Sequence, residues 1–122
     1  PAARGQSTRV ELRCPDAACN PYLALALCLA AGLDGIEKGL TPPEEITENI
    51  FAMDDETRVA HGIENLPSNL GEAVDALCAD KLMCSTLGEH VFPRYVAGKR
   101  KEWEEYSRQV TDWEIKRYMT LL

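Results

Sequence analysis

A short alternating segment followed at once by a nearly unbroken apolar one constrains this chain more than any other feature. Residues 8–14 alternate charged and apolar side chains, which is typical of a strand with one polar and one apolar face. The apolar segment begins at Asn20 and Pro21, a good N-cap and a good first helical residue, and reaches Gly32, which suits a helix end. We therefore expect a strand over 8–14 and a helix over 21–31. Because this helix is apolar on all sides, we expect it to be buried.

The rest of the chain predicts a long connection followed by helices. Residues 39–68 contain several prolines and glycines, which favours an irregular surface segment. The pairs Asn69 with Glu72 and Thr111 with Glu114 have the spacing of capping boxes, which indicates two helix starts. The expected fold class is α+β, a mostly helical chain with one N-terminal strand in a single domain. The expected later helices are 69–79, 80–87, 89–107 and 112–119.

Composition excludes several classes of function. The net charge of -7 disfavours binding to the phosphate backbone of nucleic acid. The longest apolar run is about half of the ~20 residues that span a bilayer, so no membrane segment is predicted. Five cysteines without a CxxC pair are typical of reduced thiols in a cytoplasmic protein. The chain starts at Pro1 and enters its first predicted element within a few residues, so we expect it to be part of a larger protein.

Three charged residues occupy the polar face of the predicted strand. Arg9 and Arg13 flank Glu11 at alternate positions. Guanidinium groups bind phosphate or carboxylate with two parallel donors, and a carboxylate binds a divalent cation. Phosphoryl transfer needs this mixture, because negative charge spreads over the phosphate oxygens in its transition state. The pattern alone favours a solvated strand face whose charges pair across the sheet.

Three segments carry a resemblance to a known family. Residues 4–13 read Arg-Gly-Gln-Ser-Thr-Arg-Val-Glu-Leu-Arg, residues 20–24 read Asn-Pro-Tyr-Leu-Ala, and residues 30–36 read Ala-Ala-Gly-Leu-Asp-Gly-Ile. Together with Pro15 and Asp16, these segments resemble the C-terminal part of the catalytic domain of type I (bacterial) glutamine synthetase. The resemblance extends less specifically to the rest of the chain. We therefore expect residues 1–122 to be the C-terminal portion of that domain.

The resemblance implies a role for each charged residue of the strand. Glu11 matches a ligand of an active-site divalent metal ion, Mg²⁺ or Mn²⁺, of which the family holds two or more. Arg13 matches the catalytic arginine that binds the side-chain carboxylate of the glutamate substrate and its phosphorylated form, and Arg9 matches one near the nucleotide phosphates of ATP. The implied reaction makes glutamine from glutamate, ammonia and ATP through γ-glutamyl phosphate. Because other family ligands lie outside these residues, we expect the isolated chain to be inactive.

The resemblance also implies an assembly and a difference in regulation. Type I synthetases are homo-oligomers, dodecamers of two rings, and their C-terminal helix reaches into the opposite ring. Residues 112–119 resemble that helix. Phe51 stands where some members carry a tyrosine whose hydroxyl is adenylylated. A phenyl ring has no such oxygen, so we expect that control to be missing.

Two other interpretations stay open from the sequence. The chain could be a noncatalytic binding or oligomer-assembly module derived from a synthetase-like fold. It could also be an unrelated helical domain in which Arg9, Glu11 and Arg13 form a plain solvated strand face. Residues upstream of Pro1 would distinguish these, because an enzyme needs its remaining metal ligands there.

Overall fold

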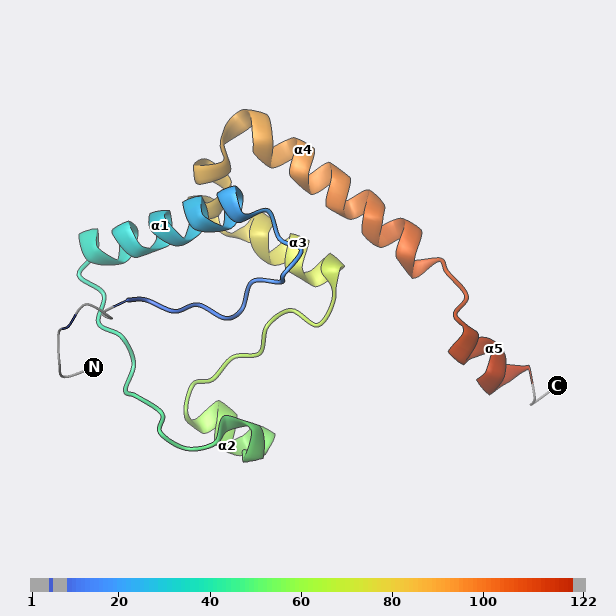
Figure 1. The fold of residues 1–122 in the computed structure, drawn as a ribbon, viewed down its shortest axis with the longest axis horizontal. Helices are drawn as coiled ribbons and strands as arrows, with labels where there is room; N and C mark the ends of the chain where they lie inside the picture. The colour runs from blue at the N-terminus through green and yellow to red at the C-terminus, as the bar shows by residue number, and fades with distance from the viewer. Residues whose placement is uncertain (1–4, 6–8, 120–122) are drawn as a thin grey trace.

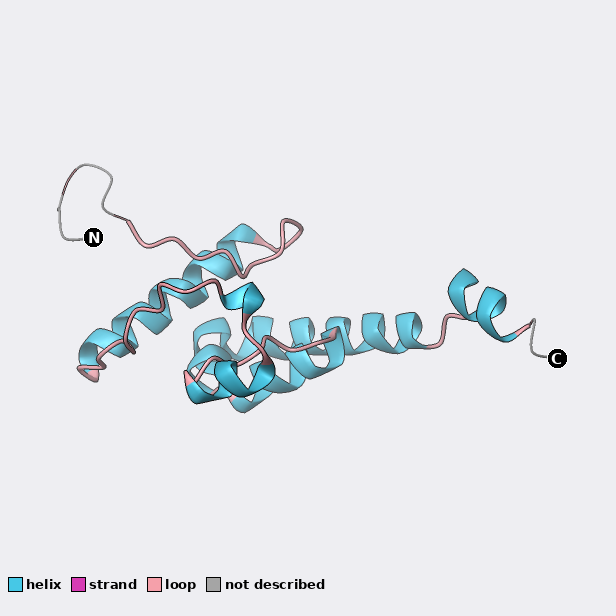
Figure 2. Ribbon diagram, turned by 90° about the horizontal axis from the view of Figure 1, so that it is seen from below, coloured by secondary structure: helices cyan, strands magenta, loops and turns pink. Residues whose placement is uncertain are grey.

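The computed structural model describes residue 5 and residues 9–119 as helices joined by irregular segments (Figure 1). The predicted α+β class is wrong, because the described part of the chain contains no β-strand (Figure 2). The elements are α1 (Pro21–Glu37), the 3₁₀ turn η1 (Ile50–Ala52), α2 (Asp55–Ala60), α3 (Leu70–Ala79), α4 (Lys81–Ser107) and α5 (Asp112–Tyr118).

The segment predicted as a strand over 8–14 is extended but is not part of a β-sheet where the structure describes it, from Arg9 to Cys14. A strand is stabilised by backbone hydrogen bonds to a neighbouring strand. Here the neighbouring element is α1, whose own backbone groups are satisfied within the helix. Alternation predicts which side chains share a face, but it does not supply the partner that makes a sheet.

Helix α1 is longer and more exposed than the predicted buried helix over 21–31. Asn20 caps its start by accepting hydrogen bonds from two backbone N–H groups of the first turn. Gly32 lies inside the helix, and the end is made by Gly39, whose φ of 60° suits glycine. The Gly39 N–H bonds to the carbonyl of Ile36 and the next N–H bonds to Gly35, which is a Schellman motif. None of the residues in α1 is buried.

Helices α3 and α4 form the main packing interface. Asp80 ends α3 and caps α4, since its side chain accepts hydrogen bonds from Leu82 N–H at 2.8 Å and Met83 N–H at 3.1 Å. Arg100 of α4 also donates to Asp75 of α3 at 2.8 Å. The two helices therefore pack as an antiparallel pair that is connected at Asp80.

Helix α4 is sharply bent at Gly88. This residue has φ 72° and ψ 172°, a conformation that only glycine adopts readily. The predicted boundary between helices 80–87 and 89–107 falls at this residue. The bend lets the second part of α4 run back beside α3 (Figure 1).

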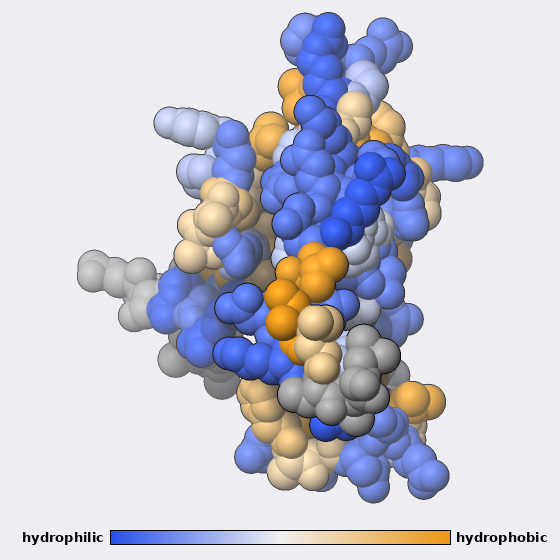
Figure 3. Space-filling model, turned by 90° about the vertical axis from the view of Figure 1, so that its right-hand side faces the viewer, coloured by the Kyte–Doolittle hydropathy of each residue, from blue (hydrophilic) through white to orange (hydrophobic). Residues whose placement is uncertain are grey.

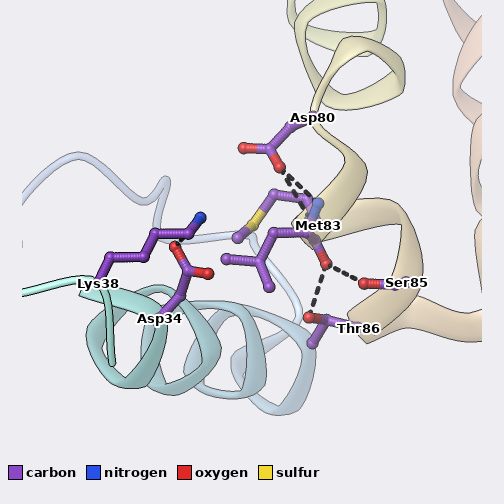
Figure 4. A network of polar contacts seen from close by, with 7 residues as sticks. Asp34, Lys38, Asp80, Met83, Ser85 and Thr86 are labelled. Atoms are coloured by element: carbon purple, nitrogen blue, oxygen red, sulfur yellow. Dashed lines mark hydrogen bonds and ion pairs between the residues drawn. The ribbon is translucent and has the colours of Figure 1, made fainter. Parts of the chain in front are cut away.

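Helix α1 packs against the first part of α4. Figure 4 shows the two elements close together, with the Lys38–Asp34 ion pair of α1 at 2.8 Å near Met83. In α4 the hydroxyls of Ser85 and Thr86 donate to the Leu82 carbonyl. Helices α1, α3 and α4 thus surround a small apolar centre.

That centre is small for a chain of this length. Among the described residues only Val74 and Leu87 are buried, at 3% and 9% exposure. A cavity of about 270 Å³ remains between α1, α3 and α4. The accessible surface is 11087 Å², whereas a folded monomer of 13.5 kDa exposes about 6500 Å². The fold therefore presents much of its apolar surface outward.

The remaining elements lie away from this centre. Helix α2 lies within the connection 39–68, and α5 lies beyond the far end of α4 (Figure 1). The predicted capping box at Thr111 and Glu114 is confirmed, with both reciprocal hydrogen bonds present. Within the described residues, no helix combines the length and apolar character needed to cross a membrane.

Candidate functional site

The extended segment gathers its three charged side chains into one cluster. Arg9 Nη2 lies 3.0 Å from Glu11 Oε2, and Arg13 Nη2 lies 2.6 Å from Glu11 Oε1. Arg13 Nε also donates to Oε1 at 2.7 Å. The alternate spacing of an extended backbone places all three on one side, as predicted. Each oxygen of the Glu11 carboxylate therefore faces a different guanidinium.

This cluster is exposed and contributes little to folding. The Glu11 side chain is 44% exposed, and both arginines are more exposed than Glu11. Ion pairs of this kind contribute roughly 0–1 kcal/mol to stability. The three side chains together carry one net positive charge in a chain whose net charge is -7. The arrangement therefore favours binding of an anionic ligand, because the guanidiniums lie at the surface, where such a ligand can reach them.

An apolar groove separates the segment from α1. Val10, Leu12 and Pro15 line one side. The other side is a stripe along α1 made of Leu25, Cys28, Leu29, Leu33 and Ile36. In Figure 1 the segment runs back beside α1 in the opposite direction. The helix therefore acts as a rigid support for the charged cluster.

Two adjacent side-chain caps produce this reversal of direction. Asp16 Oδ1 accepts a hydrogen bond from Ala18 N–H at 2.7 Å, and the Asp16 carbonyl accepts one from Cys19 N–H at 3.0 Å. Asn20 then caps α1, with Oδ1 at 3.0 Å from Tyr22 N. Sequence reasoning gave Asp16 no role. An aspartate directly after a proline and shortly before a helix N-cap is the signal that could have found it.

The described residues offer only part of a metal site. No group of three or more histidine, cysteine, aspartate or glutamate side chains in the described part of the chain could hold a metal ion. Glu11 alone offers hard carboxylate oxygens at the cluster. A divalent ion there would need further ligands from elsewhere, so the chain does not form a metal centre by itself.

Both histidines, both tryptophans and Phe51 lie away from the cluster. His61 ends α2, whereas His90 Nδ1 lies 3.2 Å from Arg94 in α4. Phe51 lies in η1 and is fully exposed at 102%. Trp103 packs on α3, and Trp113 lies in α5. Of the site residues predicted from the sequence, all of which are described, Arg9, Glu11 and Arg13 come together in one cluster.

Comparison with known proteins identifies a family for nearly the whole chain. Residues 1–118 match the family described as the glutamine synthetase catalytic domain. A glutamine synthetase of Clostridium saccharobutylicum is 55% identical over 119 residues, which are 98% of this chain and 27% of that protein. One from Methanosarcina mazei is 50% identical over 122 residues, which are 100% of this chain and 27% of that protein.

A solved structure supports the same relationship. The structure titled "Apo GmaS without ligand" matches with a TM-score of 0.70 at 40% identity, and covers 88% of this chain and 24% of that chain. The chain thus spans about a quarter of the length of the relatives that it matches. The similar proteins come from both bacteria and archaea.

Proposed function

Because this chain belongs to the glutamine synthetase catalytic-domain family, we propose that it supplies one side of the active site of a full-length glutamine synthetase. That enzyme, of type I, joins glutamate and ammonia at the expense of ATP. The observation that carries the proposal is the cluster in which Glu11 lies between Arg9 and Arg13. Two guanidinium groups beside a carboxylate suit a reaction in which negatively charged groups, the nucleotide phosphates and the substrate carboxylate, come together in one site.

The reaction assigns a distinct task to each side chain. The glutamate side-chain carboxylate attacks the γ-phosphorus of ATP, ADP leaves, and γ-glutamyl phosphate forms. Ammonia then attacks the acyl carbon, phosphate leaves, and the nitrogen loses a proton. Arg13 binds the substrate carboxylate and its phosphorylated form, while Arg9 binds the nucleotide phosphates. Both arginines offset negative charge that increases in the transition state.

Glu11 has two tasks in this proposal. Its carboxylate orients the two guanidiniums through the ion pairs seen at 3.0 and 2.6 Å. It also offers oxygen to a divalent cation, Mg²⁺ or Mn²⁺, completed by ligands outside this chain. When bound, such a cation withdraws charge from the phosphoryl oxygens. One carboxylate is too few for a site, so the rest of the full-length protein is required.

The proposal includes the location and assembly of the enzyme. We place it in the cytoplasm, where ATP and glutamate are available, as a dodecamer. Helix α5 would reach the opposite ring, as in type I synthetases. Its exposed apolar residues Trp113, Ile115 and Tyr118 support that role. The same observation favours the second candidate function, a noncatalytic assembly module, if the cluster proves dispensable.

The experiment compares Glu11→Gln with the wild-type full-length protein in glutamine formation. Glutamine keeps the size of the side chain but removes its charge, so we expect activity to fall by ~10² or more. Arg13→Lys should also be impaired, because an ammonium group cannot reproduce a two-pronged contact. Glu37→Gln, at the exposed end of α1, is the matched control and should retain activity. Near-normal turnover of Glu11→Gln with unchanged magnesium dependence would favour the assembly module.

A further inference from the structure

The extended segment that carries the charged cluster lies beside α1 across an apolar groove. It has no sheet partner in the described chain, and Val10 and Leu12 are both exposed. The segment faces α1 across the apolar groove, where contact is not directional. Directional hydrogen bonds appear where the chain turns into α1: Asp16 accepts one from Ala18 N–H, and Asn20 accepts one from Tyr22 N–H in the first helical turn.

The turn at Asp16 is closed by two hydrogen bonds that Asp16 accepts. The side-chain oxygen accepts from Ala18 N–H at 2.7 Å, and the carbonyl accepts from Cys19 N–H at 3.0 Å. An aspartate that accepts a bond from the backbone two residues later stabilises a tight turn. The chain then enters α1 at Asn20, whose side chain fixes the first helical turn. The direction of the upstream segment relative to α1 is therefore set between Asp16 and Asn20.

We propose that Asp16 is a positioning residue, whose side chain fixes the turn that holds Arg9, Glu11 and Arg13 in place beside α1. The inference rests on the proposed function for its catalytic consequence. Asp16 acts through the turn and not through contact with substrate. Its bond to Ala18 N–H needs an acceptor oxygen and no negative charge. An asparagine side chain meets that requirement, whereas an alanine side chain does not.

The test compares Asp16→Ala and Asp16→Asn in the full-length protein. A mutation far from the reacting atoms that displaces a catalytic group by about 1 Å can lower the rate by ~10². We therefore expect Asp16→Ala to lower kcat by about 10-fold or more. Asp16→Asn should stay within about twofold of wild type, because asparagine forms the same turn. Asp34→Ala removes the ion pair with Lys38 at the other end of α1 and is the matched control.

A second measurement does not depend on activity. Hydrogen exchange should become faster in residues 9–16 and 17–23 of Asp16→Ala, and should stay at the wild-type rate in Asp16→Asn. Residues 29–37 should be unaffected in both. If wild type makes no glutamine but this exchange pattern appears, the proposed function fails and the positioning role stands.

Three results would overturn the positioning role. Unchanged exchange in Asp16→Ala would show that the turn does not hold the segment. Equal loss of activity in both variants would show that the negative charge of Asp16 is used directly. A loss of activity that matches the loss of folded protein in Asp16→Ala would show a general structural role.

Discussion

At the residue scale, the packing of α3 on α4 depends on the missing side chain of Gly71. A Cβ atom at this position would lie 2.6 Å from Trp103 Nε1 and 3.1 Å from Asn69 Oδ1. Trp103 also stacks on Tyr106, with ring centroids 5.9 Å apart, so its ring cannot move without disturbing a neighbour. The same indole therefore covers the first turn of α3 and restricts what can occupy it.

Replacement of Gly71 by alanine should destabilise the protein. Overpacking costs about 1–3 kcal/mol, which exceeds the gain of up to ~1 kcal/mol in helix propensity. The thermal unfolding midpoint of full-length Gly71→Ala should fall. Gly98→Ala is the control, because it lies inside α4 and a Cβ atom added there would meet nothing within 4 Å. The unfolding midpoint of Gly98→Ala should stay the same or rise. An equal change of the midpoint in both variants would argue against the Trp103 contact.

At the element scale, the helix starts depend on carboxylates that accept local hydrogen bonds. The Ser68 hydroxyl and backbone N–H, with the Asn69 amide, lower the pKa of Glu72 at the start of α3. The Thr111 backbone N–H and hydroxyl do the same for the pKa of Glu114 at the start of α5. In each case the ionised form is favoured by folding, which links helix stability to pH.

This linkage predicts a loss of stability in acid. A carboxyl group whose pKa is lowered by folding stabilises the folded state above its unfolded pKa. That contribution is lost as the pH falls through the folded pKa. Between about pH 6 and about pH 3, the unfolding midpoint should therefore fall further for wild type than for Glu72→Gln. Glu37→Gln is the control for loss of one surface carboxylate. Identical acid profiles for wild type and Glu72→Gln would contradict the account of this cap.

The sequence predicts features that depend on neighbours in the chain and misses those that depend on distant ones. The capping box at Thr111 and the helix boundary at Gly88 depend on residues within a few positions, and both agree with the structure. The strand over 8–14 and the burial of α1 require partner surfaces, which no local pattern contains. The charged cluster was predicted because alternate spacing is a local pattern. The role of Asp16 was missed because its turn sets the direction of the segment relative to α1, which no local pattern contains.

At the scale of the whole molecule, apolar surface on α5 points to a contact outside this chain. Trp113, Ile115, Tyr118 and Met119 are all exposed. Figure 3 looks onto the end that carries α5 and shows apolar surface at the centre, among hydrophilic side chains. An isolated helix this short is marginal in water, so it needs a surface to pack on.

Deletion of residues 111–122 from the full-length protein should therefore weaken its assembly and leave each subunit folded. Sedimentation velocity should show smaller species, while far-ultraviolet circular dichroism should show preserved helix. An assembly of unchanged size would show that α5 is dispensable for subunit contact. Loss of the folded subunit would place α5 in the core of the full-length protein.

A side-by-side assay of glutamine formation tests the central claim most directly. It compares the full-length protein with residues 1–122 in the presence of ATP, glutamate, ammonium and magnesium. The cluster of Arg9, Glu11 and Arg13 supplies one side of the site, and the described residues hold no complete metal centre. Turnover by the full-length protein and none by residues 1–122 is therefore expected. Turnover by residues 1–122 alone, or none by the full-length protein, would contradict the account.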